Sequence, residues 1–298
     1  MSKTSLEPKI PLDPWLAALL RDIDELLDGL GIPYLLTGAM ARELLLHYAH
    51  GCPPGRRTTD VDFGVALRCW EDFETLKSAL SRTGRFQADP KAAQRMIHQV
   101  PGIMHRTVID LVPFGSIANP DGKLVWPPDG SMVMRVLGYD QALPHAIHLQ
   151  VDDHHAVPIA SAPGLVCMKL TAWMDRGEAT LNRDAVDVLE LLHQYAHVLT
   201  VEELYDEHPD VMERYGFREE PAVACILGRQ VAAMADAPLG RIIDQALLPQ
   251  HQQRMLDSFL RERSAMESEE RLTTARGLLE AFCDGYRTES GERAPAQE

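Results

Sequence analysis

The sequence contains few cysteines, and nothing in their spacing suggests that they are joined. The five cysteines of the 298-residue chain are scattered and include no Cys-x-x-Cys pair: Cys52, Cys69, Cys167, Cys225 and Cys283. A disulfide framework needs paired cysteines, and a zinc ribbon needs closely spaced pairs. We therefore expect reduced thiols, as in a cytoplasmic protein, and no zinc ribbon.

Long apolar runs are also missing. The first residues, MSKTSLEPKIPLDP, hold no apolar core of signal-peptide length. No run of about 18 apolar residues, the length needed to span a bilayer, occurs in the chain. We expect a protein that is neither secreted nor inserted in a membrane.

Positive charge is scarce. Lys and Arg number 29 against 44 Asp and Glu, which gives a net charge of −15. Residues 201–298 hold 20 acidic residues, 11 basic residues and no lysine, a net charge of −9. Such a chain cannot bind nucleic acid with its whole surface, so any contact with nucleic acid needs a local basic patch.

One stretch, Arg82 to Arg106, does have a local excess of positive charge. It contains five cations, Arg82, Arg85, Lys91, Arg95 and Arg106, and one acidic residue, Asp89. This stretch is the best candidate for binding a phosphate-rich acceptor such as an RNA end. The alternative is that these are scattered, solvated charges.

The composition is that of a globular protein, with 45% hydrophobic and 24% charged residues. The length suits one large domain or two modest ones. Strand and helix patterns mix in the first half, whereas almost only helical patterns follow Pro163. We predict a mixed domain over 14–160, a helical domain over 161–287, and flexible tails at 1–13 and 288–298.

The hydrophobic periodicity predicts the following elements. Helices are expected at 14–30, 41–48, 70–80, 165–175 and 181–195 and over most of 200–287, strands at 33–37, 60–66 and 107–114, and turns at 121–122, 129–130 and 152–153.

Two carboxylates lie two residues apart on one predicted strand. Side chains alternate along a strand, so Asp60 and Asp62 share one face with Cα atoms about 7 Å apart. Crowded carboxylates repel each other unless a cation lies between them. Oxygen ligands of this kind suit Mg²⁺ or Mn²⁺, which bind one or two carboxylates together with substrate phosphates. A solvated strand face is the alternative interpretation of this pattern alone.

A third carboxylate, Asp110, lies within the apolar strand Val108–Val112. Burial of an acid there is costly unless it is paired or bound to a metal. Three strand carboxylates that converge can hold two metal ions about 4 Å apart, an arrangement that stabilises both the attacking and the leaving oxygen in phosphoryl transfer.

A strand-to-helix turn at Gly38 precedes the carboxylates. Backbone N–H groups at such a turn favour phosphate. Arg56 and Thr58 lie just upstream of Asp60 and are placed to contact the same phosphates.

These motifs together resemble the polymerase-beta-like nucleotidyltransferase superfamily and, within it, the AbiEii/AbiGii toxin type. The resemblance covers residues 34–192. The matching strings are Leu36-Thr37-Gly38-Ala39-Met40-Ala41, Arg56-x-Thr58-x-Asp60-Val61-Asp62-Phe63, Ile109-Asp110-Leu111, Lys169-Leu170-Thr171-Ala172-Trp173 and Arg183-Asp184-Ala185-Val186-Asp187.

The resemblance implies an α+β fold: an N-terminal mixed β-sheet nucleotidyltransferase domain flanked by helices, followed by an all-α C-terminal domain. It also implies a metal-dependent enzyme (EC 2.7.7 type) that moves a nucleoside monophosphate from an NTP to a hydroxyl acceptor. The candidate acceptors are an RNA or tRNA end, a protein and a small molecule. By the same kinship the chain would be the toxin of a toxin–antitoxin pair, with an antitoxin protein as a possible partner.

The resemblance also implies roles for individual residues. Asp60 and Asp62 would hold Mg²⁺ or Mn²⁺, and Asp110 would complete a second metal site and position the acceptor hydroxyl. Lys169 would neutralise phosphate charge, and Asp184 or Asp187 would contact the nucleotide or orient Lys169. The implied nucleotide-binding residues are Gly38, Ala39, Arg56, Thr58, Lys169 and Asp184.

One residue departs from the family pattern. Most relatives have Gly-Gly or Gly-Ser at the turn, whereas here Ala39 follows Gly38. Alanine has no hydroxyl for phosphate and resists positive φ. Either the turn tolerates Ala39 or triphosphate binding is weakened.

Two other clusters resemble metal sites but are interpreted without a metal. His193 and His197 stand four residues apart, a spacing that can bind zinc, but they lack the glutamate of His-Glu-x-x-His. We interpret them as surface or hydrogen-bonded histidines. The acidic run at 152–155, Asp-Asp-His-His, is interpreted as a turn rather than a metal site.

Two other functions remain open. Asp60 and Asp62 alone would suit a glycosyltransferase that binds a metal–nucleotide-sugar, although that function leaves Gly38 and Asp110 without a role. Ala39 and the acidic helical half would also suit a catalytically weakened module that binds nucleotide or a protein partner.

Overall fold

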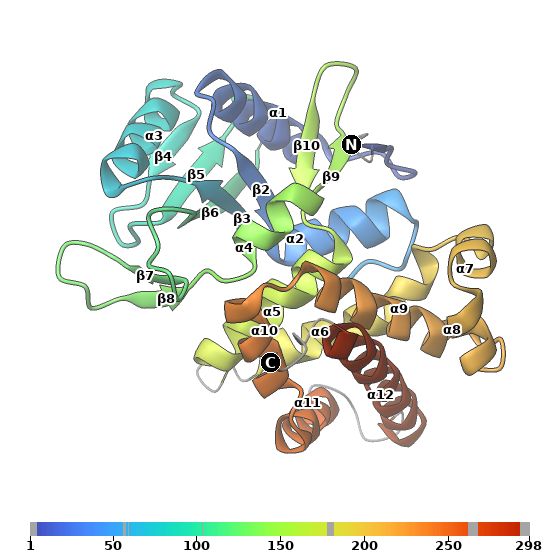
Figure 1. Ribbon diagram of the computed structural model, residues 1–298. Helices are drawn as coiled ribbons and strands as arrows, with labels where there is room; N and C mark the ends of the chain where they lie inside the picture. Colours follow the sequence, from blue (N-terminus) through green and yellow to red (C-terminus); the bar gives the residue numbers. More distant parts are fainter. Residues whose placement is uncertain are drawn as a thin grey trace. The chain divides into compact units, whose positions relative to one another are not determined.

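The computed structural model describes residues 5–55, 58, 60–102, 104–177, 182–261 and 268–292 (Figure 1). The chain divides into two compact units, Met1–Ser161 (unit 1) and Ala162–Glu298 (unit 2). Within the described ranges, no helix is both long enough and apolar enough to cross a membrane.

An eight-stranded mixed sheet forms the core of unit 1. In spatial order the strands are β1 (Ser5–Leu6), β9 (Ile147–Gln150), β10 (Ala156–Ile159), β2 (Tyr34–Thr37), β3 (Asp60–Ala66), β6 (Arg106–Phe114), β5 (Arg95–Gln99) and β4 (Phe86–Ala88). The central strands β3 and β6 are parallel, and β2 and β5 flank them antiparallel. This sheet, with helices around it, confirms the predicted fold class.

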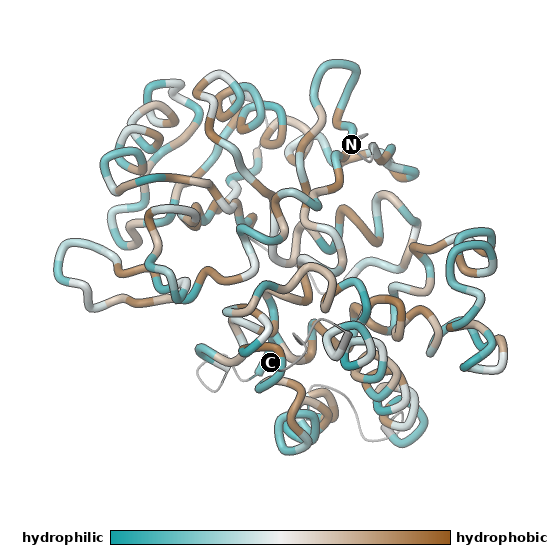
Figure 2. Tube along the Cα trace, in the orientation of Figure 1, coloured by the Kyte–Doolittle hydropathy of each residue, from teal (hydrophilic) through white to brown (hydrophobic). Residues whose placement is uncertain are grey.

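The two faces of the central strands differ in character. Val61, Phe63, Ile109 and Leu111 point to one face and are almost fully buried. The alternate residues point to the other face, and among them Asp60, Asp62 and Asp110 are half-buried. The sequence pattern of β3 and β6 therefore separates a structural face from a functional face. In Figure 2 the turn between β9 and β10 is hydrophilic.

Helix α1 (Pro14–Gly29) packs against the structural face. Pro14 stands at its first position, as predicted, and buried leucines follow at helical spacing. Asp22 of α1 is 2.8 Å from Nε2 of His98 on β5, and both side chains are buried. Burial lowers the pKa of His98 more than the charge of Asp22 raises it, so the neutral ring donates to the carboxylate. This hydrogen bond links α1 to β5, next to the edge strand β4 of the sheet.

The remaining elements of unit 1 are shorter. They are α2 (Gly38–Glu43), the π-helix η1 (Leu44–Ala49), α3 (Trp70–Arg82), α4 (Tyr139–Ala142), the 3-10 helix η2 (Leu143–His145) and a separate hairpin of β7 (Lys123–Val125) and β8 (Val133–Arg135). The predicted turns at 129–130 and 152–153 connect β7 to β8 and β9 to β10.

The structure adds elements that the sequence patterns did not predict. β4 and β5 lie within the basic stretch 82–106. The predicted tail 1–13 contributes β1, whose short backbone pairs in parallel with β9. Helix α12 ends at Glu292, inside the predicted tail 288–298.

Every regular element among the described residues of unit 2 is helical. The helices are α5 (Ala162–Arg176), α6 (Arg183–Gln194), the 3-10 helix η3 (Tyr195–His197), α7 (Val201–Glu207), α8 (Pro209–Arg214), α9 (Glu219–Met234), α10 (Ala237–Ala246), α11 (Pro249–Arg261) and α12 (Ser268–Glu292). Glycines bring α9 and α12 together: a Cβ at Gly228 would overlap the carbonyl oxygen of Phe282, and a Cβ at Gly285 would overlap that of Cys225.

Candidate active site

Four neighbouring strands each contribute one side chain to a row across the functional face of unit 1. Thr37 of β2 pairs with Asp62 of β3, Asp62 pairs with Asp110 of β6, and Asp110 pairs with Arg95 of β5. Residues directly opposite in neighbouring strands point to the same face. The sheet therefore holds two of the predicted aspartates side by side, and it adds Arg95.

Asp60 lies two residues before Asp62 on β3 and points to the same face as this row. Its Oδ1 accepts a hydrogen bond of 2.8 Å from the hydroxyl of Thr58, whose Oγ1 is also 3.1 Å from the Asp60 carbonyl oxygen. Thr58, predicted to contact phosphate, thus touches the carboxylate of Asp60.

Gly38 lies against the carboxylate of Asp62. Its φ of +69° is in the left-handed region, and a Cβ at this position would overlap Oδ2 of Asp62 and lie 2.9 Å from its Cγ. Glycine is needed twice at this position, once for the backbone conformation and once for the space. Ala39 is not among the residues with positive φ, so the turn places that demand on Gly38 alone.

Arg95 takes both carboxylate oxygens of Asp110. Its Nε donates to Oδ1 at 2.9 Å and its Nη2 donates to Oδ2 at 2.8 Å. The side chain of Asp110 is 14% exposed and that of Arg95 is 34% exposed. The hydrogen bonds to Asp110 and the charges of Asp110 and Asp60 raise the pKa of Arg95. Asp110 is therefore an ion-paired carboxylate on the functional face.

This ion pair involves Asp110, the third carboxylate of the predicted metal site. Within the described ranges, no three acidic, His or Cys side chains are grouped to hold one metal ion together. Asp60, Asp62 and Asp110 share one face, but the guanidinium of Arg95 occupies the position next to Asp110. On this face the structure places two carboxylates on β3 and the Asp110–Arg95 ion pair beside them, and the metal-binding role of the three carboxylates stays a prediction.

The sequence patterns do not identify Arg95 as a site residue, because they do not identify its strand. The stretch stands out only by its charge, and Arg-Met-Ile-His-Gln mixes polar and apolar residues without a clear strand signal. The available signal is alternation, since Met96 and His98 are buried and Arg95 and Ile97 are half-buried.

The other cations of the basic stretch separate into two groups. Arg85 forms an ion pair with Asp22, in addition to the pairing of Arg95. Arg82, Lys91 and Arg106 are exposed. Fewer cations of this stretch are therefore available to a phosphate-rich acceptor than their number in the sequence implies.

A second cluster lies within unit 2 and joins three residues of the predicted motifs. Nζ of Lys169 on α5 donates to Asp184 at 3.0 Å and to Asp187 at 2.6 Å, both on α6. Burial lowers the pKa of an ammonium group, but the charges of Asp187 and Asp184 outweigh it and raise the pKa of Lys169. Lys169 is thus a cation held in place by two carboxylates.

The start of α6 is fixed by Asn182. This residue has a φ of +58°, and its Oδ1 accepts a hydrogen bond of 2.9 Å from Nε1 of the buried Trp173 on α5. The contact ties the first turn of α6 to α5, which places Asp184 opposite Lys169.

Among the described residues, neither of the two remaining candidate clusters belongs to a group of three or more possible metal ligands. His193 and His197 are exposed. Asp152 accepts hydrogen bonds from the backbone of His154 and from both backbone and ring of His155, which lower its pKa to about 2. That segment is the β9–β10 turn, as predicted. Arg56 lies outside the described residues.

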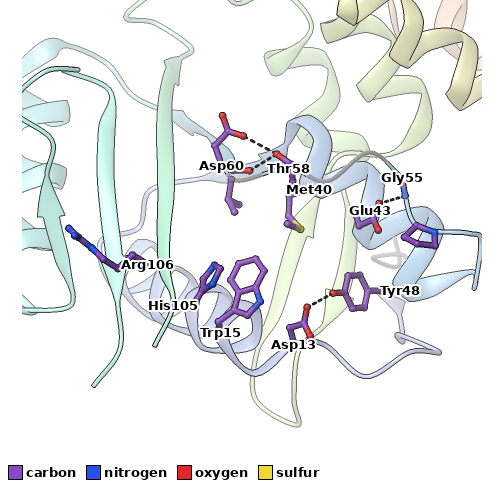
Figure 3. A pocket seen from close by; sticks show the side chains of 12 residues that line it. Asp13, Trp15, Met40, Glu43, Tyr48, Gly55, Thr58, Asp60, His105 and Arg106 are labelled. Carbon is purple, nitrogen blue, oxygen red and sulfur yellow. Dashed lines mark hydrogen bonds between the residues drawn. The ribbon is translucent and has the colours of Figure 1, made fainter. Parts of the chain in front are cut away.

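A cavity of about 560 Å³ opens beside Asp60 in unit 1 (Figure 3). Trp15 and His105 lie next to each other in its wall, with ring centroids 4.4 Å apart. Its other lining residues include Asp13, Met40, Glu43, Tyr48 and Thr58. Figure 3 shows Asp60 and Thr58 on one side of the cavity and the hydrogen-bonded pair Asp13–Tyr48 on another.

A family model described as the nucleotidyl transferase AbiEii toxin of a type IV toxin–antitoxin system matches residues 22–279. No curated protein matches the sequence. Among solved structures, an antigenic nucleotidyltransferase-like protein from Paracoccidioides brasiliensis is 19% identical, with a TM-score of 0.41 over 70% of this chain and 95% of that one. The antibiotic-resistance factor ANT(2'')-Ia is 14% identical, with a TM-score of 0.38 over 69% and 95%. A CCA-adding enzyme in complex with CTP is 14% identical, with a TM-score of 0.25 over 90% and 79%.

Proposed function

Because the chain belongs to the AbiEii nucleotidyl transferase toxin family, we propose that it moves a nucleoside monophosphate from an NTP to a hydroxyl acceptor. The acceptor oxygen would form a bond to the α-phosphorus, the bond from that phosphorus to the β-phosphate oxygen would break, and pyrophosphate would leave. The observation that carries the proposal is the approach of Gly38 to Asp62, with Asp60 on the same strand face.

The donor set fits a divalent cation in part. Asp60 and Asp62 present carboxylate oxygens from one face of β3, the ligand type that Mg²⁺ and Mn²⁺ prefer. We propose that these two residues hold the ion, which when bound would neutralise phosphate charge. Asp110 is engaged by Arg95, so it is not assigned to this ion.

The other residues would bind and orient the substrates. Gly38 leaves room for the carboxylate of Asp62 beside the strand-to-helix turn, where the backbone N–H groups would bind phosphate. Thr58 holds the carboxylate of Asp60 in one orientation. Lys169 stays protonated at neutral pH because its pKa is raised, which suits the neutralisation of phosphate, and Asp184 and Asp187 would orient it.

The cavity beside Asp60 is the proposed entry for one of the two substrates. The adjacent rings of Trp15 and His105 offer an aromatic surface, and Asp13 and Glu43 offer acceptors for hydroxyl or amine groups. RNA ends, protein hydroxyls and small molecules all carry such groups. The family also supports a role as the toxin of a toxin–antitoxin pair, which we include in the proposal.

The test is transfer of label from each α-labelled NTP, with Mg²⁺, to total RNA, total protein and small molecules incubated separately. Wild-type protein should label one acceptor class, and Asp62→Asn should lose the transfer. Asp121→Asn, an exposed aspartate in the turn before β7, is the matched control and should keep it.

Two outcomes would contradict the proposal. Transfer that survives Asp62→Asn would remove Asp62 from the site. Nucleotide binding by calorimetry without transfer to any acceptor class would favour a binding module over an enzyme.

A further inference from the structure

The ion pair between Arg95 and Asp110 is built into the sheet. The two residues are directly opposite in the antiparallel pair β5–β6, and their side chains meet through two parallel N–H···O bonds. Such bidentate pairs are geometrically specific and stronger than single contacts. Strand register therefore places Arg95 beside Asp110, and the two hydrogen bonds hold the guanidinium on the carboxylate.

The backbone around Arg95 is also fixed. The amide of Arg95 donates to the carbonyl of Ala92, its carbonyl accepts from Asp89, and the neighbouring carbonyl of Gln94 accepts from Leu111 on β6. Lys77 of α3 donates to the carbonyl of Ala93 at 2.6 Å. Hydrogen bonds therefore fix the backbone of residues 92–95 at the start of β5, so Arg95 stands on a well-held segment.

A guanidinium that pairs with a carboxylate weakens the attraction of that carboxylate for a divalent cation. Both oxygens of Asp110 already accept hydrogen bonds from Arg95, and two positive groups at one carboxylate repel each other. The carboxylate that would complete a two-ion site is therefore already neutralised by a charge that cannot be removed by deprotonation.

Resting on the proposed function, we propose that Arg95 stands in place of a second metal ion. The chain holds a single divalent cation, on Asp60 and Asp62, and the Asp110–Arg95 pair supplies the second positive charge. Two of the five guanidinium N–H groups bind Asp110. The remaining N–H groups belong to a side chain that is 34% exposed, on the same face as Asp60, where they bind the triphosphate of the NTP.

The experiment counts bound Mn²⁺ on the full chain by electron paramagnetic resonance, in the presence of a non-hydrolysable NTP analogue. Wild type should bind one Mn²⁺. Arg95→Gln frees Asp110 and should bind a second Mn²⁺, and the double variant Arg95→Gln/Asp110→Asn should return to one. Arg68→Gln, which changes a cation whose side chain is 84% exposed and lies outside the basic stretch, should behave as wild type.

A second measurement, made on Asp110→Asn, does not depend on the folding of the Arg95 variants. Asp110→Asn alone should keep one Mn²⁺ with its affinity changed by less than about threefold, because Asp110 is not a ligand. In addition, Arg95→Gln should weaken binding of the NTP analogue without metal by about tenfold, the loss expected for hydrogen bonds to a charged group.

The proposal is overturned if wild type binds two Mn²⁺ or none, if Arg95→Gln still binds one, or if Asp110→Asn abolishes Mn²⁺ binding. These readouts need no turnover. The predicted Mn²⁺ counts without label transfer would therefore contradict the proposed function and leave the assignment of Arg95 standing.

Discussion

At the scale of single residues, Gly38 has the most restrictive position in unit 1. It combines a φ of +69° with a backbone that lies against the carboxylate of Asp62. A methyl group there must displace Asp62, because the turn after β2 is held by the pairing of Thr37 with Asp62. The glycine of the strand-to-helix turn is therefore a requirement of the carboxylate as well as of the backbone.

We predict that Gly38→Ala lowers kcat/KM for nucleotidyl transfer by about 100-fold, the cost of misplacing a reacting group by about 1 Å. It should also lower the free energy of unfolding by about 1–2 kcal/mol, because alanine is strained in the left-handed region. Steady-state kinetics and denaturant unfolding measure the two effects.

Gly84→Ala is the control for backbone strain. Gly84 has a similar φ of +72°, and nothing lies within 4 Å of the place that an alanine methyl group would occupy. It should lose a similar free energy of unfolding and keep full activity. Equal activity of Gly38→Ala and wild type would show that Asp62 tolerates displacement.

At the scale of elements, the α9–α12 packing in unit 2 depends on two glycines. Gly228 and Gly285 each face the backbone of the other helix, with no room for a Cβ. Backbone atoms of packed helices cannot move aside as a flexible side chain can. The two helices are therefore in contact through their main chains, and this fixes how they cross.

We predict that Gly285→Ala lowers the free energy of unfolding by about 3 kcal/mol, the upper part of the usual range for overpacking. Gly277→Ala on the same helix is the matched control, because nothing lies within 4 Å of its Cβ position. It should raise the free energy of unfolding by about 0.5–1 kcal/mol through helix propensity. If both variants are stabilised, the close helix contact does not exist in solution.

At the scale of the whole molecule, the cysteines test how tightly both units are packed. All five are free, and four are buried, Cys52 in unit 1 and Cys167, Cys225 and Cys283 in unit 2. Burial raises the pKa of Cys167 to about 12 and that of Cys283 to about 11. Since the thiolate is the reactive form, these two thiols are protected from reaction both by burial and by their raised pKa.

We predict that a disulfide reagent at pH 8 modifies one thiol of the native protein quickly, that of the half-buried Cys69, and all five after unfolding. Cys69→Ser should leave the native protein without a fast thiol. Rapid reaction of two or more thiols in the native state would mean that one of the two cores opens readily.

The sequence predicted the elements whose patterns are regular. β3 alternates between polar and apolar residues over its first four positions, β6 is a long apolar run, and α1 has a Pro start and leucines at helical spacing; all three lie within a few residues of their predicted bounds. The shared face of Asp60 and Asp62 also followed from alternation, whereas the position of Asp110 on that face depends on the β3–β6 register. The strand next to β6 was not predicted, because residues 95–99 mix polar and apolar side chains without a clear strand pattern. The neighbour of Asp110, a cation rather than a metal ion, was therefore visible only in the structure.

The row from Thr37 through Asp62 and Asp110 to Arg95 has a further consequence. Its spacing is set by the distance between adjacent strands, about 4.8 Å, and not by any loop. Loss or gain of one amino acid within β6 would turn Asp110 to the hydrophobic side. Insertions at the β9–β10 turn would leave the row intact. Related sequences can therefore differ in length at the outer turns of the sheet, whereas in its central strands they can differ only by amino-acid substitution.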